Sequence, residues 1–128
     1  MKILIVGTRS FDNYDAFFEY VNVVINQETR KATSPITILS DERKGVGKFA
    51  KRYARENNIS YVQYSIRTDF ATPLDRDNAL VRDADISVFI DDKQDWHTRY
   101  MLDAMKALGK PTRRLLVKRR KKKEEEPK

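Results

Sequence analysis

Residues 2–10 read KILIVGTRS. Residues 3–6 are all apolar, and Gly7 ends the apolar run. A short continuous apolar run of this kind is typical of a strand that is buried on both faces, as in a parallel sheet. We therefore expect a central parallel strand over residues 2–6, followed by a polar loop.

Helix and strand patterns alternate along the rest of the chain. Apolar residues recur every three or four positions over residues 14–25, 46–54 and 96–108, and this spacing predicts amphipathic helices. Pro73 is expected to begin a further short helix. Strand-forming residues dominate four more segments: 36–39, 60–64, 86–90 and 114–117. This alternation predicts an α/β protein, a Rossmann-like three-layer αβα domain with a parallel sheet of about five strands.

The net charge of +7 is concentrated near the C-terminus of the 128-residue chain. Residues 110–128 contain ten Lys and Arg against three Glu, a difference equal to the net charge of the whole chain. Blocks of like charge are usually solvated and disordered. We therefore expect one domain over residues 1–117 and a charged, disordered tail over residues 118–128. Weak contact with nucleic acid or an acidic surface is the partner that this tail suggests.

Composition excludes several classes of protein. The chain has no cysteine and a single histidine, which excludes disulfides, thiolate catalysis and metal sites built from several Cys or His. No apolar run approaches the ~20 residues of a membrane helix, and the apolar run at the N-terminus is too short for a signal peptide. We expect a cytoplasmic protein with no metal, no cofactor and no membrane contact, and homo-oligomers remain open.

Polar residues gather where the predicted strands end. Ligands of parallel sheets bind outside the carboxyl ends of the strands, where the strand order reverses. In the first such loop, the Arg9 guanidinium and the hydroxyls of Thr8 and Ser10 are suited to a phosphate or carboxylate. In the second loop, Lys44 and Gly45 precede a helix start, whose free N–H groups favour an anion. The first loop could instead only cap its helix, and the second could be a solvated charged turn.

Carboxylates follow the second and fourth predicted strands. Asp91 and Asp92 are adjacent, and successive strand side chains point to opposite faces, so a single metal site cannot easily use both. Asp92 could instead bind a ribose hydroxyl. Asp41 and Glu42 in the second loop would repel a phosphate that lay beside them.

Other polar and aromatic residues near the helix starts favour structural roles. We interpret Arg76 and Asp77 as a surface salt bridge with a helix cap. Trp96 lies on the apolar stripe of its helix and is expected in the core rather than stacked on a ligand. His97 falls off that stripe and is expected to be exposed, without a catalytic role.

Several motifs resemble a known family. The residues GTRSF at 7–11, the glycine-containing loop after the second strand, Asn78 at the third helix and ADI at 84–86 resemble the YspA-like members of the SLOG superfamily. This superfamily includes relatives of YpsA, DprA and the "Lonely guy" proteins. The resemblance covers about residues 1–117, and it implies a Rossmann-like fold that binds a nucleotide or a nucleotide-derived ligand.

The chain departs from these relatives at two loops. Where the family has Gly-Gly-Ala-Arg-Gly-Ala-Asp, residues 41–47 read DERKGVG, which keeps only Lys44 and Gly45 in kind. Where related proteins carry a Pro-Gly-Gly-x-Gly-Thr phosphate loop, only Thr98 remains, and Met101 replaces the glutamate of the "Lonely guy" enzymes. Phosphoribohydrolase activity is therefore not expected.

The leading hypothesis is a small-molecule binding domain for a nucleotide- or nucleoside-derived ligand. Its expected contacts are Arg9, Ser10, Lys44 and Asn78, with Thr8 and Gly45 shaping the loops and Asp92 reading a hydroxyl. One alternative is a divergent hydrolase of nucleotide N-glycosidic bonds, with Asp41, Glu42, Asp91 or Asp92 as acid or nucleophile. Another is an interaction protein that kept the fold and lost the site, a drift that would suit a phage protein. Catalytic residues stay unassigned.

Overall fold

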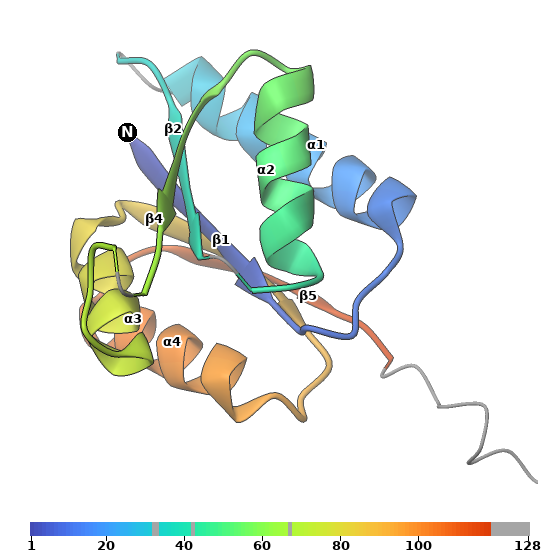
Figure 1. Ribbon diagram of the computed structural model, residues 1–128. Helices are drawn as coiled ribbons and strands as arrows, with labels where there is room; N and C mark the ends of the chain where they lie inside the picture. The colour runs from blue at the N-terminus through green and yellow to red at the C-terminus, as the bar shows by residue number, and fades with distance from the viewer. Residues whose placement is uncertain (32–33, 42, 67, 119–128) are drawn as a thin grey trace, which may run out of the picture.

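The protein alternates strands and helices along its whole described length (Figure 1). The structure is a computed structural model, and it describes residues 1–31, 34–41, 43–66 and 68–118. The elements are β1 (Lys2–Gly7), α1 (Tyr14–Lys31), β2 (Thr37–Asp41), α2 (Val46–Glu56), β3 (Ser60–Tyr64), α3 (Pro73–Asp83), β4 (Ile86–Asp91), α4 (Trp96–Ala107) and β5 (Thr112–Leu116).

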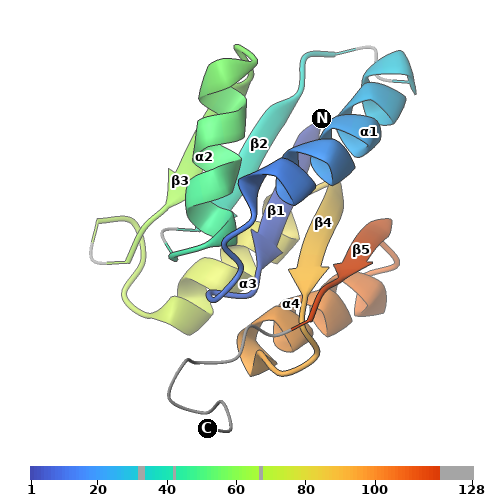
Figure 2. The ribbon, with the colours of Figure 1, turned by 90° about the vertical axis from the view of Figure 1, so that its right-hand side faces the viewer.

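The strands form one parallel sheet in the order β3-β2-β1-β4-β5. In the register, Leu4 of β1 lies beside Leu39 of β2 and Ser87 of β4. Helices α1 and α2 cover one face of the sheet, and α3 and α4 cover the other (Figure 2). The predicted Rossmann-like three-layer fold is confirmed, and the order of the strands reverses between β1 and β4.

Two hydrophobic cores explain the continuous apolar run at the start of the chain. Ile3 and Ile5 of β1 pack under α1 and α2, whereas Leu4 and Val6 pack against α3 and α4. All four side chains are almost completely buried. A strand with helices on both faces has no polar side, so its sequence shows no alternation.

Short polar side chains begin three of the helices. Asn13 Oδ1 accepts a hydrogen bond from the Ala16 N–H, 3.0 Å away, at the start of α1. Thr72 Oγ1 accepts from the Asp75 N–H at 3.1 Å, and Pro73 follows it in the first turn of α3. Asp95 caps α4 through the His97 N–H at 3.1 Å. Each cap satisfies a backbone donor that a helix start leaves free.

A lysine ties together the amino edge of the sheet. Lys110 Nζ donates to the carbonyl oxygens of Val81, Arg82 and Ala84 at 2.7–2.8 Å. At the same edge, Asp85 Oδ2 accepts from the Lys2 N–H at 2.7 Å. These bonds link the end of α3 to the starts of β5 and β1. They lie at the edge of the sheet opposite the carboxyl ends of the strands.

The described residues bear on two further expectations. None of their helices is long and apolar enough to cross a membrane. The charged tail expected over residues 118–128 lies outside the described residues, apart from the exposed Lys118. The division into a domain and a tail therefore stays a prediction.

Three tyrosines make the stability of the fold sensitive to alkaline pH. Burial, the largest cause in each case, raises the pKa of Tyr14, Tyr61 and Tyr64 to about 12. Hydrogen bonds from Tyr14 to Glu56 and from Tyr64 to Asp83 also favour the protonated phenols.

Folded-state pKa values above the ordinary value of about 10 mean that the native protein binds more protons than the unfolded chain at high pH. The stability contributed by these phenols is fully present below pH ~10 and is lost as the pH rises toward 12. Urea unfolding at several pH values, followed beside tyrosinate absorbance, should show this loss. Titration of all six tyrosines near pH 10 in the folded protein would contradict it.

Candidate functional site

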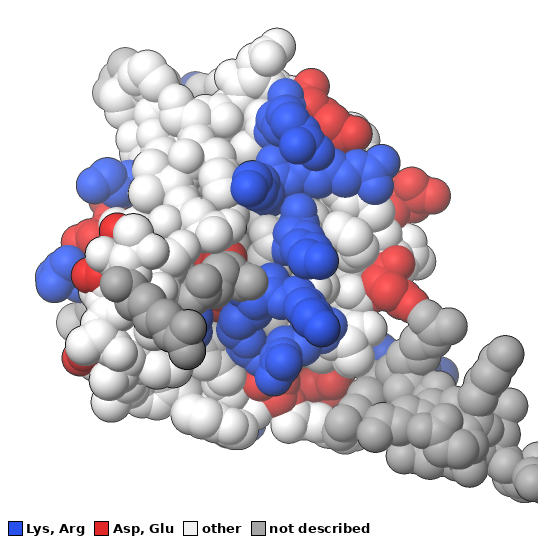
Figure 3. Space-filling view, in the orientation of Figure 1, with Lys and Arg blue, Asp and Glu red and all other residues white. Residues whose placement is uncertain are grey.

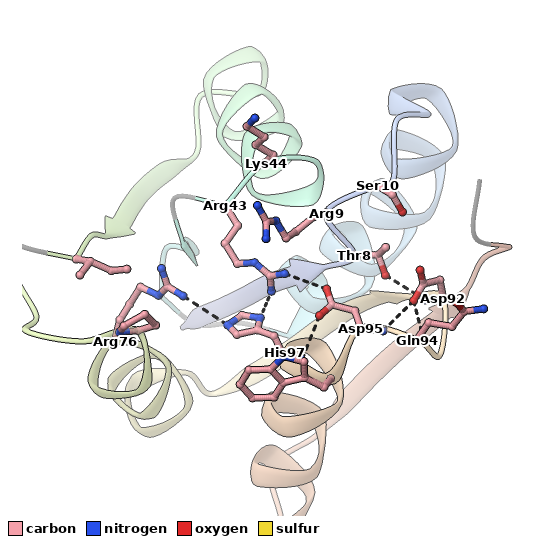
Figure 4. A pocket seen from close by; sticks show the side chains of 13 residues that line it. Thr8, Arg9, Ser10, Arg43, Lys44, Arg76, Asp92, Gln94, Asp95 and His97 are labelled. Carbon is pink, nitrogen blue, oxygen red and sulfur yellow. Dashed lines mark hydrogen bonds and ion pairs between the residues drawn. The ribbon is translucent and has the colours of Figure 1, made fainter. Parts of the chain in front are cut away.

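A cavity of about 740 Å³ lies at the carboxyl edge of the sheet. Figure 3 shows Lys and Arg side chains around a hollow below α2, and Figure 4 shows the residues that line the cavity. They come from the loops after β1, β2, β3 and β4 and from the starts of α3 and α4: Thr8, Arg9, Ser10, Arg43, Lys44, Ile66, Pro73, Arg76, Asp92, Gln94, Asp95, Trp96 and His97. A cavity of this size suits a small organic ligand.

The structure brings together five of the seven residues that the sequence suggested for binding. Thr8, Arg9, Ser10, Lys44 and Asp92 all line the cavity. Asn78 lies outside the lining, and its Oδ1 accepts a hydrogen bond from the Tyr100 hydroxyl of α4 at 2.7 Å. Gly45, the seventh, is also outside the lining and shapes a loop.

Gly45 lets the second loop pack directly on the first. Its φ is +75°, a conformation that side-chain-bearing residues rarely adopt. A Cβ at this position would lie 2.7 Å from the Arg9 carbonyl oxygen and 2.9 Å from the Thr8 carbonyl oxygen. The glycine therefore sets how closely Lys44 and Arg9 approach each other across the cavity.

Thr8 joins the ends of β1 and β4 at the point where the strand order reverses. Its N–H donates to the Ile90 carbonyl at 3.0 Å, and its hydroxyl oxygen accepts from the Asp92 N–H at 3.1 Å. Asp92 Oδ1 then accepts from the N–H groups of Gln94 and Asp95 at 2.8 and 3.1 Å. These bonds hold the fourth loop without the glycines of a phosphate loop.

A buried polar chain forms one wall of the cavity. Asp77 accepts from Arg76 Nε at 3.0 Å and from His97 Nε2 at 2.6 Å. The other ring nitrogen of His97 accepts a hydrogen bond from Arg43, whose Nη2 also donates to Asp95 Oδ2 at 3.0 Å. Both ring nitrogens are therefore engaged by protein groups, an arrangement that fits a neutral imidazole and makes His97 a positioning residue for Arg43.

Burial shapes the ionisation of this chain. It raises the pKa of Asp77 above the ordinary value, and nearby Asp41 adds to the rise, whereas the guanidinium of Arg76 opposes it. Arg76 and Asp77 are each 3% exposed. Removal of either charge from such a pair leaves the other in a low-dielectric interior.

The structure corrects three interpretations of the sequence. Arg76 and Asp77 do not form a surface salt bridge, since both are buried between α3 and α4. His97 is also buried, because it faces Asp77 across the two helix starts. Trp96 is not in the core: it is the first residue of α4, it lines the cavity and it is 75% exposed.

The candidate catalytic carboxylates are not gathered at the cavity. Asp91 lies outside the lining, and its Oδ2 accepts from Arg114 Nε and Nη2 at 3.0 and 2.7 Å. Asp41 is buried outside the lining, whereas Asp92 faces the cavity. Glu42 lies outside the described residues. Asp91 and Asp92 thus diverge, as the alternation of strand side chains predicts.

One cluster has the composition of a metal site. Asp41, Asp77 and His97 offer ligand atoms within 4.8 Å of one another, a grouping that the sequence spacing did not suggest. The guanidiniums of Arg76 and Arg43 already bind Asp77 and His97. Two protein cations beside the ligand atoms would repel a metal ion, so the cluster is better suited to holding the arginines.

Two cations at the cavity are available to a ligand. Within the described part of the chain, neither Arg9 nor Lys44 forms a salt bridge or a side-chain hydrogen bond, and both are exposed. Helix α2 starts just after Lys44, with no side-chain cap and no acidic residue in its first turn. The helix dipole adds to the attraction for an anion there, whereas the Asp41 carboxylate, which lies next to Gly47 in this turn, opposes it.

The fold and the cavity define a Rossmann-like α/β protein with a cationic hollow at the carboxyl edge of its sheet. No protein-family model matches the chain, and comparison with curated proteins finds no match. The chain resembles the X-ray structure of TM1055, a target of the Northeast Structural Genomics Consortium. The two share 19% identity and a TM-score of 0.58, over 87% of this chain and 71% of that one. This likeness supports the fold.

Proposed function

We propose that the protein binds a nucleotide-derived ligand in the cavity at the carboxyl edge of the sheet. The observation that carries the proposal is the pairing of two available cations with an exposed aromatic ring in one cavity. Arg9 and Lys44 supply the charge, and Trp96 supplies the ring. A nucleotide combines an anionic phosphate with a flat base, so both parts of the cavity have a complementary group on the ligand.

In this arrangement the phosphate lies between the first and second loops. The Arg9 guanidinium and the Ser10 hydroxyl donate from one side, and Lys44 and the start of α2 act from the other. The base stacks on the Trp96 indole, and the carboxylate of Asp92 is placed to accept from a sugar hydroxyl. Arg43 is held by His97 and Asp95 and is therefore a rigid part of the wall.

We propose a family for the chain on the same basis. The GTRSF motif and the loop at Lys44 and Gly45 support a divergent YspA-like member of the SLOG superfamily, and the Rossmann-like fold is compatible with it. The hydrolase alternative has weaker support, because Asp91 is bound by Arg114 and Asp41 lies outside the lining. Incubation of a nucleoside monophosphate with the protein, followed by analysis for released base, tests it directly.

Replacement of Arg9 by alanine should weaken nucleotide binding about tenfold or more, since a charged hydrogen bond contributes ~1.5–3 kcal/mol. The measurement is a set of titrations with nucleoside monophosphates, nucleosides, ADP-ribose and cyclic nucleotides. Binding is detected by the fluorescence of Trp96, the single tryptophan of the chain, and by the shift in thermal unfolding. A nucleoside should bind the wild type more weakly than its monophosphate and should be little affected by R9A.

The matched control is Arg30→Ala. Arg30 is an exposed cation in the last turn of α1, at the opposite edge of the sheet. It changes the net charge equally and should leave binding unaltered. If no nucleotide binds the wild type, or if both variants lose affinity equally, the cavity is not the site and the proposal fails.

A further inference from the structure

Basic side chains on α2 continue the positive charge of the cavity across the folded surface. Figure 3 shows Lys and Arg in a band that runs over α2 toward the hollow beneath it. The exposed members on the helix are Lys48, Lys51, Arg52 and Arg55, and exposed Lys44 stands between them and the cavity. Residues 1–109 have no net charge, and their sequence shows no sign of this band, because net charge does not show where the charges lie in space.

The spacing of these residues makes the band a single line. Positions 51 and 52 each lie three or four residues from positions 48 and 55, so all four residues lie on one side of the helix. With a rise of 1.5 Å per residue, the positions of Lys48 and Arg55 are about 10 Å apart along the helix. A single phosphate cannot reach both ends, so the line fits several anionic groups in sequence.

Local partners leave most of this charge available. Arg52 is engaged, because it pairs with Glu56 at 3.2 Å and lies over the Tyr14 ring. Glu56 is the one acidic residue of α2, and it also accepts a hydrogen bond from the Tyr14 hydroxyl. Lys48 and Lys51 form no salt bridge within the described ranges of the chain. The face therefore keeps a positive excess next to the cavity.

We propose that α2 and the cavity together bind the end of a single-stranded nucleic acid. Its terminal nucleotide occupies the cavity, and the following phosphates run along Lys44, Lys48, Lys51 and Arg55. This inference rests on the proposed function, since it makes the nucleotide in the cavity the end of a longer chain. A positive track beside an exposed aromatic ring is the combination by which proteins hold single strands without reading their sequence.

The exposed Trp96 favours a single strand over other polyanions. An acidic peptide or polyphosphate would satisfy the lysines but has no flat ring to cover the indole. In a duplex, the bases are stacked on one another and are not free to lie on a side chain. A single strand offers both the phosphates and an unstacked base.

The test compares two triple variants of the full chain. The first is Lys48→Gln, Lys51→Gln and Arg55→Gln on the track. The second is Arg30→Gln, Lys31→Gln and Lys106→Gln, three exposed cations in the last turns of α1 and α4, away from the cavity. Both sets remove the same charge, retain the C-terminal residues and introduce a residue that favours helix.

Each protein is titrated with a thymidine strand of about 12 nucleotides, a length within known single-strand sites. Quenching of Trp96 is the readout, and thymidine monophosphate is measured in parallel. The track variant should bind the strand at least tenfold more weakly, while its monophosphate binding stays unchanged. Its salt dependence, as the slope of log K against log salt, should be smaller by about 2, since each lost phosphate contact removes ~0.7.

The remaining outcomes overturn the inference. Equal loss in both triple variants would mean that net charge alone, and not the track, attracts the strand. If polyglutamate displaced the thymidine strand as well as an unlabelled strand does, binding would not require a nucleic-acid base. Binding of the monophosphate without tighter binding of the strand would end the inference and leave the proposed function standing. If neither the monophosphate nor the strand bound, both the inference and the proposed function would fail.

Discussion

Replacement of Asp77 by alanine should lower the free energy of unfolding by about 3–5 kcal/mol, the usual cost of removing one partner of a buried ion pair. Asp77 is the shared acceptor for Arg76 Nε and His97 Nε2, and all three side chains are buried. Without it, the buried Arg76 guanidinium loses the carboxylate that accepts from its Nε and neutralises its charge. Urea unfolding followed by circular dichroism measures the loss.

A neighbouring pair provides the control. Arg82 and Asp83 are also adjacent on α3, with the same Nε–Oδ1 distance of 3.0 Å as Arg76 and Asp77. The Arg82 side chain is 72% exposed, so Arg82→Ala should leave the urea midpoint nearly unchanged. If Asp77→Ala moved the midpoint no further than this control, the buried chain would not be a major source of stability.

Gly45→Ala should cost about 4 kcal/mol, the second large effect. Two terms add: backbone strain at a positive φ, about 1–3 kcal/mol, and overpacking, about 1–3 kcal/mol. The clash is with the carbonyl oxygens of Arg9 and Thr8, which belong to the backbone and cannot rotate away. The same change should weaken nucleotide binding, because it pushes the first and second loops apart.

A substitution at Gly109 distinguishes the cost of backbone strain from the cost of overpacking. Its φ is +69°, but a Cβ there would meet no atom within 4 Å. Gly109→Ala should therefore show the strain alone, about 1–2 kcal/mol, with nucleotide binding unchanged. Equal destabilisation by the two substitutions would mean that the contact between the loops adds nothing.

The order of elements was predictable because it depends on local patterns. The apolar run of β1 and the helical spacing of Tyr14, Phe17 and Val21 are properties of consecutive residues, and they match the structure. The strand-end rule then selected Thr8, Arg9, Ser10, Lys44 and Asp92, which share the cavity.

The wall of the cavity was harder to predict because it depends on tertiary packing. Arg43, Arg76 and His97 come from three separate segments, and charged residues are normally expected on the surface. The approach of α3 to α4 buries Arg76 and His97, whereas Arg43 is only partly buried. The adjacent charges of Arg76 and Asp77 in the sequence could have suggested a buried pair. No local pattern predicts that Asp77 also pairs with His97.

The exposure of Trp96 could not be predicted from the helical spacing of apolar residues. Its position fits the apolar stripe of α4, yet the stripe predicts burial only where a neighbour covers the helix. Trp96, the first residue of α4, instead lines the cavity and is 75% exposed, whereas His97 and Thr98 in the same turn are buried. The basic face of α2 was missed for a related reason, since net charge carries no information on how charges separate in space.

The hydrogen bonds from Lys110 to three carbonyl oxygens distinguish a tightly bonded end of the molecule from the end that carries the cavity. That lysine, with Asp85 on Lys2, secures the side of the sheet where strands begin. The loops around the cavity lie at the other side and do not share those bonds. The exposed loop residues Arg9, Ser10 and Lys44 can therefore be exchanged for others that suit a new ligand while the scaffold beneath them keeps its shape, which makes this small domain a suitable starting point for redesigned specificity.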